Sequence, residues 1–198
     1  QLMKSFIAIL CLGCALSGMA ATESQWIQTL QASPASAVLV GGQMADSNAV
    51  VVTRAWNGAV CTSTVVNRGQ TPVRLARVDL FDFNHGLPGS TPFYGEAFQM
   101  LAQNGGTLAA PEDWGSYSDR KHYLIEEPEG LRTVHGMMLL RPVGADQILL
   151  GFGSCRRFDG RISFDANRRL GARDCEGLEL APGERWRLEE FFCESGPK

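Results

Sequence analysis

The side chains best suited to chemistry lie in the stretch Phe93–Tyr123, which is rich in aromatic, charged and glycine residues and has neither a helical nor a strand period. A long insertion of this kind is usually a functional loop or a disordered linker, and its many aromatic residues favour an ordered loop. Aromatic faces stack on sugar rings, and nearby polar groups fix the orientation of the ring. On this basis we predict a substrate-binding site for a carbohydrate, formed by Trp114, Tyr117, Asp119, Arg120 and His122.

Each part of this site has a structural alternative. Trp114 and Tyr117 would equally serve to pack the loop onto its scaffold. The run Asp119–Tyr123 would equally form an ionic lock between loops, because salt-bridged loops are common and usually only structural. The sequence leaves both alternatives open.

No convincing catalytic constellation stands beside this loop. The acidic pairs Glu112–Asp113 and Glu126–Glu127 are sequence neighbours, whereas a glycosidase needs two carboxylates on opposite sides of its substrate. His135 lies in an apolar stretch, so we expect it in the core or half-exposed. We therefore predict no catalytic residue, no metal site and no cofactor for this chain.

The N-terminus is typical of an export signal. Lys4 precedes an apolar run from Phe6 to Leu16, and Gly18 and Ala20 are small residues at the positions that a signal peptidase inspects. We predict a signal peptide over residues 1–20 and an exported protein, either periplasmic or secreted. Lipidation at Cys14 is the alternative, although the residue three places before it is not the expected aliphatic one.

Removal of this leader leaves the four cysteines Cys61, Cys155, Cys175 and Cys193. An even number of cysteines in an exported protein favours disulfides, and four cysteines allow three pairings, which the sequence does not distinguish. No two of them form a C-x-x-C motif, so a zinc site has little support.

The elements that must position the loop follow a β pattern. Residues Ala21–Gln31 predict a short helix with Thr22 or Ser24 as its cap. Asn57-Gly58 predicts a two-residue hairpin turn, and Asp159-Gly160 a further turn. Alternating or apolar runs bounded by turn residues predict strands over 49–56, 59–67, 73–83, 134–141, 147–155, 157–165, 174–180 and 185–194.

This spacing of strands indicates an all-β fold, an antiparallel β-sandwich that holds the long aromatic loop. We expect a lead-in over 21–48 and the sandwich over 49–194. The chain has 198 residues, of which 44% are hydrophobic and 20% charged, and this balance excludes general disorder. A net charge of -3 gives no electrostatic reason to expect nucleic acid as a partner.

Several segments carry a resemblance to a known family. They are Tyr94–Leu101 with Gly105–Leu108, then Tyr117–Tyr123, Leu149–Phe158 and Leu180–Trp186. Together they resemble the N-terminal β-supersandwich domain of α-galactosidase-like enzymes of glycoside hydrolase family 36. The resemblance covers roughly Val50 to Phe192, nearly all of the chain after the leader.

In that family, two aspartates on a following (β/α)8 barrel carry out retaining hydrolysis, and the barrel motifs that hold them are absent here. The resemblance therefore implies a non-catalytic front domain, inactive alone, with 195–198 as the start of a linker to a missing barrel. It implies three partners: that barrel, an α-galactoside or other glycan, and further copies in a homo-oligomer. It also suggests that Trp114 reaches an active site.

A stand-alone secreted carbohydrate-binding module is the main alternative, and an adhesion or assembly protein is the third. An exposed apolar face would favour the front domain of an enzyme, whereas a shallow aromatic groove would favour the binding module. Whether Lys198 is the natural C-terminus stays open.

Overall fold

The computed structural model describes residues 22–98, 102–115, 122–123 and 127–197, without the side chains of 102, 168–170 and 172–174. One helix precedes the strands. The elements in chain order are α1 (Glu23–Ala32), β1 (Ser36–Leu39), β2 (Val50–Asn57), β3 (Val60–Asn67), β4 (Val73–Asn84), β5 (Phe93–Glu96), β6 (Ala102–Gly106), β7 (Pro111–Gly115), β8 (Arg132–Leu140), β9 (Gln147–Phe152), β10 (Asp159–Phe164), β11 (Arg168–Leu180), β12 (Arg185–Arg187) and β13 (Phe191–Gly196).

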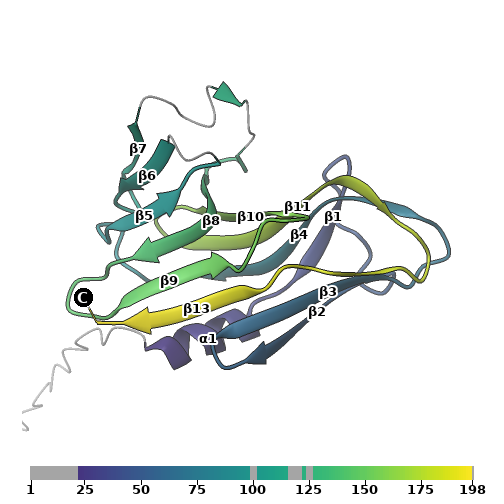
Figure 1. Cartoon of the computed structure of the whole chain (residues 1–198), viewed down its shortest axis with the longest axis horizontal. Coiled ribbons are helices and arrows are strands. Elements are labelled where there is room, and N and C mark those ends of the chain that lie inside the picture. Colours follow the sequence, from purple (N-terminus) through teal and green to yellow (C-terminus); the bar gives the residue numbers. More distant parts are fainter. Residues whose placement is uncertain (1–21, 99–101, 116–121, 124–126, 198) are drawn as a thin grey trace, which may run out of the picture.

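These strands form the antiparallel β-sandwich that the sequence predicts (Figure 1). One hydrogen-bonded path runs β1-β4-β11-β10-β8-β9-β13-β3-β12, with β2 beside β3. The path folds over on itself, because rings from opposite ends of it meet in the core. The Phe81 ring on β4 lies 4.7 Å from that of Phe191 on β13 and 6.0 Å from that of Trp56 on β2.

Strand β8 connects the two halves of the path. Its first part, from Arg132 to His135, pairs with β10, and its last part, from Met137 to Leu140, pairs with β9. Gly136 between them has a φ of 70°, which a residue with a side chain rarely adopts. The strand is therefore irregular at this glycine, and the preceding residue, His135, lines a depression on the surface together with Gly136.

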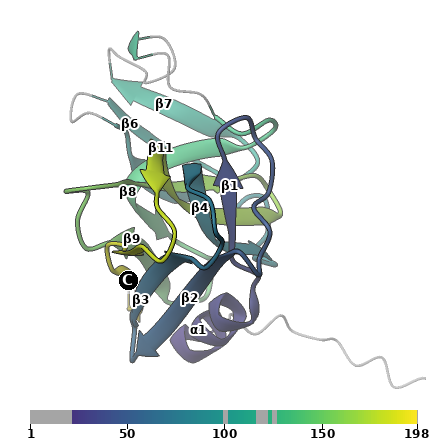
Figure 2. The ribbon, with the colours of Figure 1, turned by 90° about the vertical axis from the view of Figure 1, so that its right-hand side faces the viewer.

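Helix α1 closes one open edge of the sandwich beside β2 (Figure 2). The hydroxyl of Thr22 accepts from the Gln25 amide and the Gln25 side chain accepts from the Thr22 amide, so the predicted cap is confirmed as a capping box. Trp26 and Leu30 are the buried face of the helix, and the Trp26 ring meets Phe83 edge-on at 5.9 Å. Burial of this apolar face, more than helix propensity, holds so short a helix.

Arg54 on β2 fastens the end of this helix to the sandwich. Its guanidinium donates to the Leu30 carbonyl at 3.0 Å, to the Leu80 carbonyl at 2.6 Å and to the Ser33 carbonyl at 2.6 Å. It also lies over the Phe81 ring at 5.0 Å. A cation among the last carbonyls of a helix satisfies acceptors that have no partner inside the helix. Desolvation by burial lowers the pKa of Arg54.

Several local expectations differ from the structure, among them the single strand predicted over 185–194, which is divided into β12 and β13. The lead-in contains strand β1, whose four residues are too short for a sequence pattern but pair with β4. The stretch from Phe93 onward is not simply an irregular loop, since it contains β5, β6 and β7. Asp159 and Gly160 do not form a turn but begin β10, where they pair with Asp174 and Arg173.

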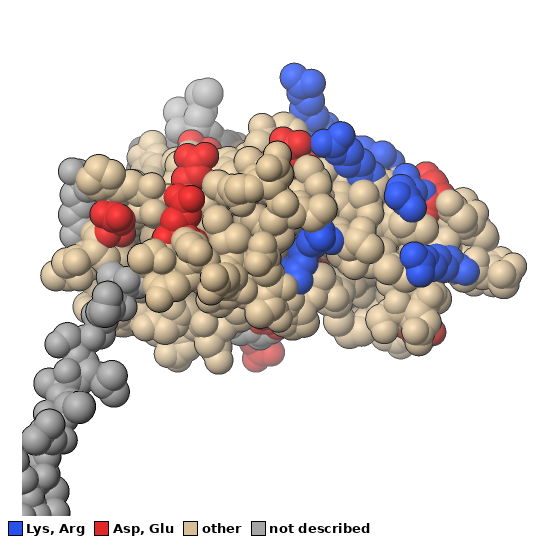
Figure 3. Space-filling view, turned by 90° about the horizontal axis from the view of Figure 1, so that it is seen from below, with Lys and Arg blue, Asp and Glu red and all other residues tan. Residues whose placement is uncertain are grey.

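The surface seen in Figure 3 is largely uncharged, with Lys and Arg side chains toward one end and Asp and Glu side chains toward the other. None of the helices in the described ranges is long and apolar enough to cross a membrane. Cys61 and Cys193 are buried free thiols and Cys155 is an exposed one. The disulfide expectation is therefore not met at these three positions.

Candidate functional site

An open pocket of about 360 Å³ lies where β5, β8, β10 and β11 come together. It is mainly polar and has one aromatic wall. Its lining residues are Glu96, Ala97, Phe98, His135, Gly136, Cys155, Arg156, Arg157, Asp159 and Glu176.

Irregular backbone on two strands opens this pocket. The bulge at Gly136 separates the pairing of β5 with Met138 from its pairing with His135, and Glu96 lies opposite His135. On β11 the register shifts between Asp174 and Leu178, and Glu176 there has a φ of 53°. Bulges re-aim side chains and interrupt strand pairing. Glu96 lies opposite the irregular part of β8 and Glu176 lies within that of β11, and both line the depression.

A partly buried network forms the floor of the pocket. With Asp159 ionised, the Nδ1 hydrogen of His135 is donated to the Oδ2 of Asp159 at 3.0 Å, and the Nε of Arg161 donates to the same oxygen at 2.8 Å. His135 is only 6% exposed. Burial alone would raise the pKa of Asp159, but His135 and then Arg161 outweigh burial and hold that pKa below its usual value. The floor is thus fixed and largely charge-compensated.

Phe98 forms the aromatic wall. Its ring meets the His135 ring nearly edge-on at 5.5 Å and the Tyr123 ring at 5.6 Å, and half of its surface is exposed to solvent (50%). His122 lies 6.4 Å from Tyr123, ring centroid to centroid. A half-exposed phenyl ring beside a fixed imidazole is a surface on which an apolar face of a ligand can rest.

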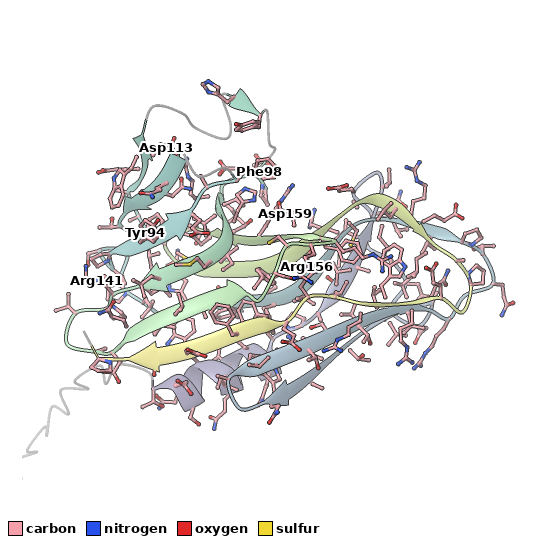
Figure 4. All side chains as sticks on the ribbon, viewed as in Figure 1. Tyr94, Phe98, Asp113, Arg141, Arg156 and Asp159 are labelled. Atoms are coloured by element: carbon pink, nitrogen blue, oxygen red, sulfur yellow. The ribbon has the colours of Figure 1, made fainter. Side chains whose placement is uncertain are left out.

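The opposite rim is the segment between β9 and β10. The guanidinium of Arg157 lies over the rings of Phe158 and Trp186 at 4.9 and 5.1 Å. The backbone amides of Arg157 and Phe158 both donate to the Glu189 carboxylate, at 2.9 and 3.2 Å. These contacts hold the segment in place, and Arg156 and Cys155 stand exposed on it. Figure 4 shows Arg156 and Asp159 below Phe98.

Strands β5, β6 and β7 form a three-stranded extension next to the pocket, seen above the body of the sandwich in Figure 1. Arg132 on β8 fastens one face of it: the guanidinium donates to Asn104 Oδ1 at 2.7 Å and forms an ion pair with Asp113. Desolvation by burial lowers the pKa of Arg132. This latch lets β6 and β7 stay extended although Gly105 and Pro111 are poor strand formers.

The structure places the predicted site residues in different regions. Trp114 lies on β7 of the extension, outside the pocket lining, and His122 lies one residue from the Tyr123 ring that packs on Phe98. Tyr117, Asp119 and Arg120 lie outside the described residues.

The pocket itself was not predicted from the sequence. His135 is buried as expected, but it belongs to the hydrogen-bonded floor of a polar pocket and is not a packed core residue. The sequence predicts Asp159 in a turn, whereas it lies on strand β10. The one usable signal was Phe98, an aromatic residue in a stretch already identified as functional, followed by a histidine and an aspartate on later strands.

The chemistry available is hydrogen bonding to a polar ligand. Glu96 and Glu176 offer exposed acceptors, Arg156 an exposed donor, and Phe98 a stacking surface. Such a set matches the hydroxyls and the apolar face of a sugar ring. Among the described residues no group of three or more His, Cys, Asp or Glu side chains is arranged to hold a metal ion.

Comparisons with known proteins add a partial likeness to a solved structure. No family model matches the chain. No curated protein matches it by sequence. Among solved structures, the α-galactosidase TtGalA from Thermus thermophilus, in complex with p-nitrophenyl α-D-galactopyranoside, overlaps it with a TM-score of 0.38 and 14% sequence identity. The overlap covers 74% of this chain and 29% of that chain, so this chain spans under a third of the galactosidase.

Proposed function

We propose that this chain is an exported, non-catalytic carbohydrate-binding β-sandwich domain that belongs to an α-galactosidase-like glycoside hydrolase. The pocket beside Phe98 holds one neutral sugar residue, a terminal α-galactoside. The observation that carries the proposal is the half-exposed Phe98 ring standing over the fixed His135–Asp159–Arg161 network.

The balance of charge in the pocket supports a neutral ligand. Asp159 accepts from Arg161 and His135, and the rest of the lining contains the carboxylates of Glu96 and Glu176 and the guanidinium groups of Arg156 and Arg157. Neither sign dominates. Carboxylate oxygens accept hydrogen bonds from sugar hydroxyls, and guanidinium groups donate to them. Because these groups lie within a shallow, open pocket, they orient a ring without enclosing it.

The same groups do not support hydrolysis. The acid of a glycosidase sits in a desolvated setting, whereas Glu96 and Glu176 are exposed to solvent. The one carboxylate of the lining that is well shielded, Asp159, accepts two hydrogen bonds and has a lowered pKa, which suits neither a general acid nor a free nucleophile. Incubation of the full chain with p-nitrophenyl α-D-galactopyranoside should release no nitrophenol, and release would contradict the non-catalytic role.

Binding is tested with methyl α-D-galactopyranoside and the full chain, by isothermal titration. Phe98→Ala should weaken binding about tenfold, as expected for loss of one stacked aromatic contact. Val143→Ala removes another exposed apolar side chain, far more exposed at 89%, and should leave binding unchanged. Equal effects of the two substitutions, or no binding by the unmodified chain, would contradict the proposal.

A second role, packing against a following catalytic barrel, is favoured by an apolar patch near the pocket. Val40, Met44 and Leu178 are exposed by 51%, 60% and 44%. Val40 lies against the backbone of Gly177, next to Leu178, and Glu176 of the pocket lies on the same strand. The nucleotide sequence downstream of the Lys198 codon tests this role: an open frame encoding repeated βα units supports it, and a stop codon contradicts it.

A further inference from the structure

One face of the three-stranded extension carries a pair of aromatic rings that the pocket does not use. Tyr94 on β5 and Trp114 on β7 have ring centroids 6.4 Å apart and planes inclined by 41°. Trp114 is 44% exposed. The two rings together form a shallow platform, here called the Tyr94–Trp114 platform.

Glycine at position 105 is what lets the indole lie flat. A Cβ built on Gly105 would stand 2.2 Å from two atoms of the six-membered ring of Trp114, so one face of the indole covers this backbone. The indole Nε1 donates to the Glu112 carboxylate at 3.3 Å, which fixes the rotation of the ring. With one face packed and an edge bonded, the exposed area of Trp114 belongs largely to the other face.

The platform and the pocket lie on the same side of β5. Phe93 and Gly95 are buried while Tyr94 and Glu96 are turned outward, as expected from the alternation of a strand. Residues two apart on one face of a strand are separated by roughly 7 Å. Tyr94 of the platform is therefore the direct neighbour of Glu96 of the pocket, at a spacing comparable to one sugar residue.

The extension is also rigid enough to hold such a platform in register. Its opposite face is fastened to β8 through Arg132, which contacts Asn104 on β6 and Asp113 on β7. The outward face with Tyr94 and Trp114 is thereby held at a set position relative to the pocket.

We infer that the Tyr94–Trp114 platform is a second sugar subsite and that the ligand is an oligosaccharide, with its terminal residue in the pocket and the next residue stacked on the indole. This inference rests on the proposed function, because it takes the pocket as the first subsite. The platform favours longer oligosaccharides, and the pocket selects the terminal sugar.

The test compares methyl α-D-galactopyranoside with the disaccharide melibiose by isothermal titration of the full chain. Melibiose should bind about tenfold more tightly, since one further ring is stacked. Trp114→Ala should remove this advantage and leave the affinity for the monosaccharide unchanged, whereas Trp114→Phe should retain part of it. Phe98→Ala should weaken the binding of both sugars.

A further variant distinguishes a loss of the platform from a loss of stability in the extension. Gly105→Ala leaves the indole in the chain but displaces it from the backbone, so it should also lower the melibiose affinity alone, and circular dichroism checks that the fold is kept. Equal binding of the two sugars, or equal losses for both in Trp114→Ala, would overturn the inference while leaving the pocket intact. Absence of binding by either sugar would overturn the proposed function as well.

Discussion

Helix α1 closes one edge of the sandwich, here called the sealed edge. The sealed edge and the open pocket contain similar side chains that have different roles. At the sealed edge, the Arg54 guanidinium bonds to the chain's own carbonyls and lies over the Phe81 ring. At the pocket, Arg156 and Phe98 are exposed, and the fixed groups lie beneath them. An arginine beside an aromatic ring is thus not in itself a sign of a site. What distinguishes the two regions is whether the arginine and the ring are buried against the chain or exposed to solvent.

The largest effect on stability is expected at the sealed edge. Arg54→Met should lower the free energy of unfolding by about 3 kcal/mol, because buried carbonyls of Leu30 and Leu80 lose a charged donor. Urea denaturation measures this loss, and sugar binding by the folded fraction should be unaffected. Arg187→Met, which removes an exposed pair with Glu190, serves as control and should change stability by less than about 1 kcal/mol.

The floor of the pocket should be intermediate, since Asp159 contributes to both stability and binding. Asp159→Asn should cost about 2 kcal/mol of stability at neutral pH, because two hydrogen bonds to a shielded charge are weakened. It should also weaken binding, since His135 then loses its fixed position. An unchanged affinity together with the lower stability would show that the network serves the fold alone.

The pH dependence of this substitution follows from the lowered pKa of Asp159. A carboxylate whose pKa is lower in the folded state stabilises the fold fully above its unfolded pKa of about 3.9, and the stabilisation is lost as the pH falls through the folded value. The stability difference between the unmodified chain and Asp159→Asn should therefore narrow below about pH 4. A difference that widens with acid would contradict this assignment.

A smaller effect is expected at the start of the helix. Thr22→Ala removes one half of the capping box with Gln25 and should cost about 1 kcal/mol. Thermal unfolding followed by circular dichroism measures it. Thr22→Ser, which keeps the hydroxyl, should restore nearly all of the loss.

The smallest effect on stability is expected at Phe98, where the effect on sugar binding is large. Phe98→Ala removes a ring that is half exposed, so the free energy of unfolding should fall by less than about 1 kcal/mol. The roughly tenfold loss of sugar affinity proposed above should accompany it. A large loss of stability would place Phe98 with the sealed edge and not with the pocket.

Local signals in the sequence predicted much of the fold. The Thr22 cap and the hairpin between β2 and β3 depend on contacts within a few residues. The cap and the hairpin are confirmed, but the turn is Gly58-Ala59, one residue later than the predicted Asn57-Gly58. Strand β1 and the pairing of β6 with β7 depend on distant partners. β6 contains Gly105, which no propensity favours in a strand, but Trp114 and Arg132 compensate for it.

The pocket could not be predicted from the sequence, because it also depends on residues that are distant in the chain. His135 and Asp159 are 24 residues apart, and they meet only because β8 pairs with β10 in one register, with Arg161 opposite His135. A shift of one residue would turn them to opposite faces. Trp114 stays a predicted site residue, and its packing on Gly105 follows from strand pairing that the sequence does not reveal.

The central claim, that the depression beside Phe98 holds a sugar, is tested most directly by an amide-resolved NMR titration of the full chain with methyl α-D-galactopyranoside. We predict saturable shifts at His135, Gly136 and Asp159, with none at Arg54 or Leu30. Shifts confined to other parts of the sandwich, or no shift at millimolar sugar, would contradict the account.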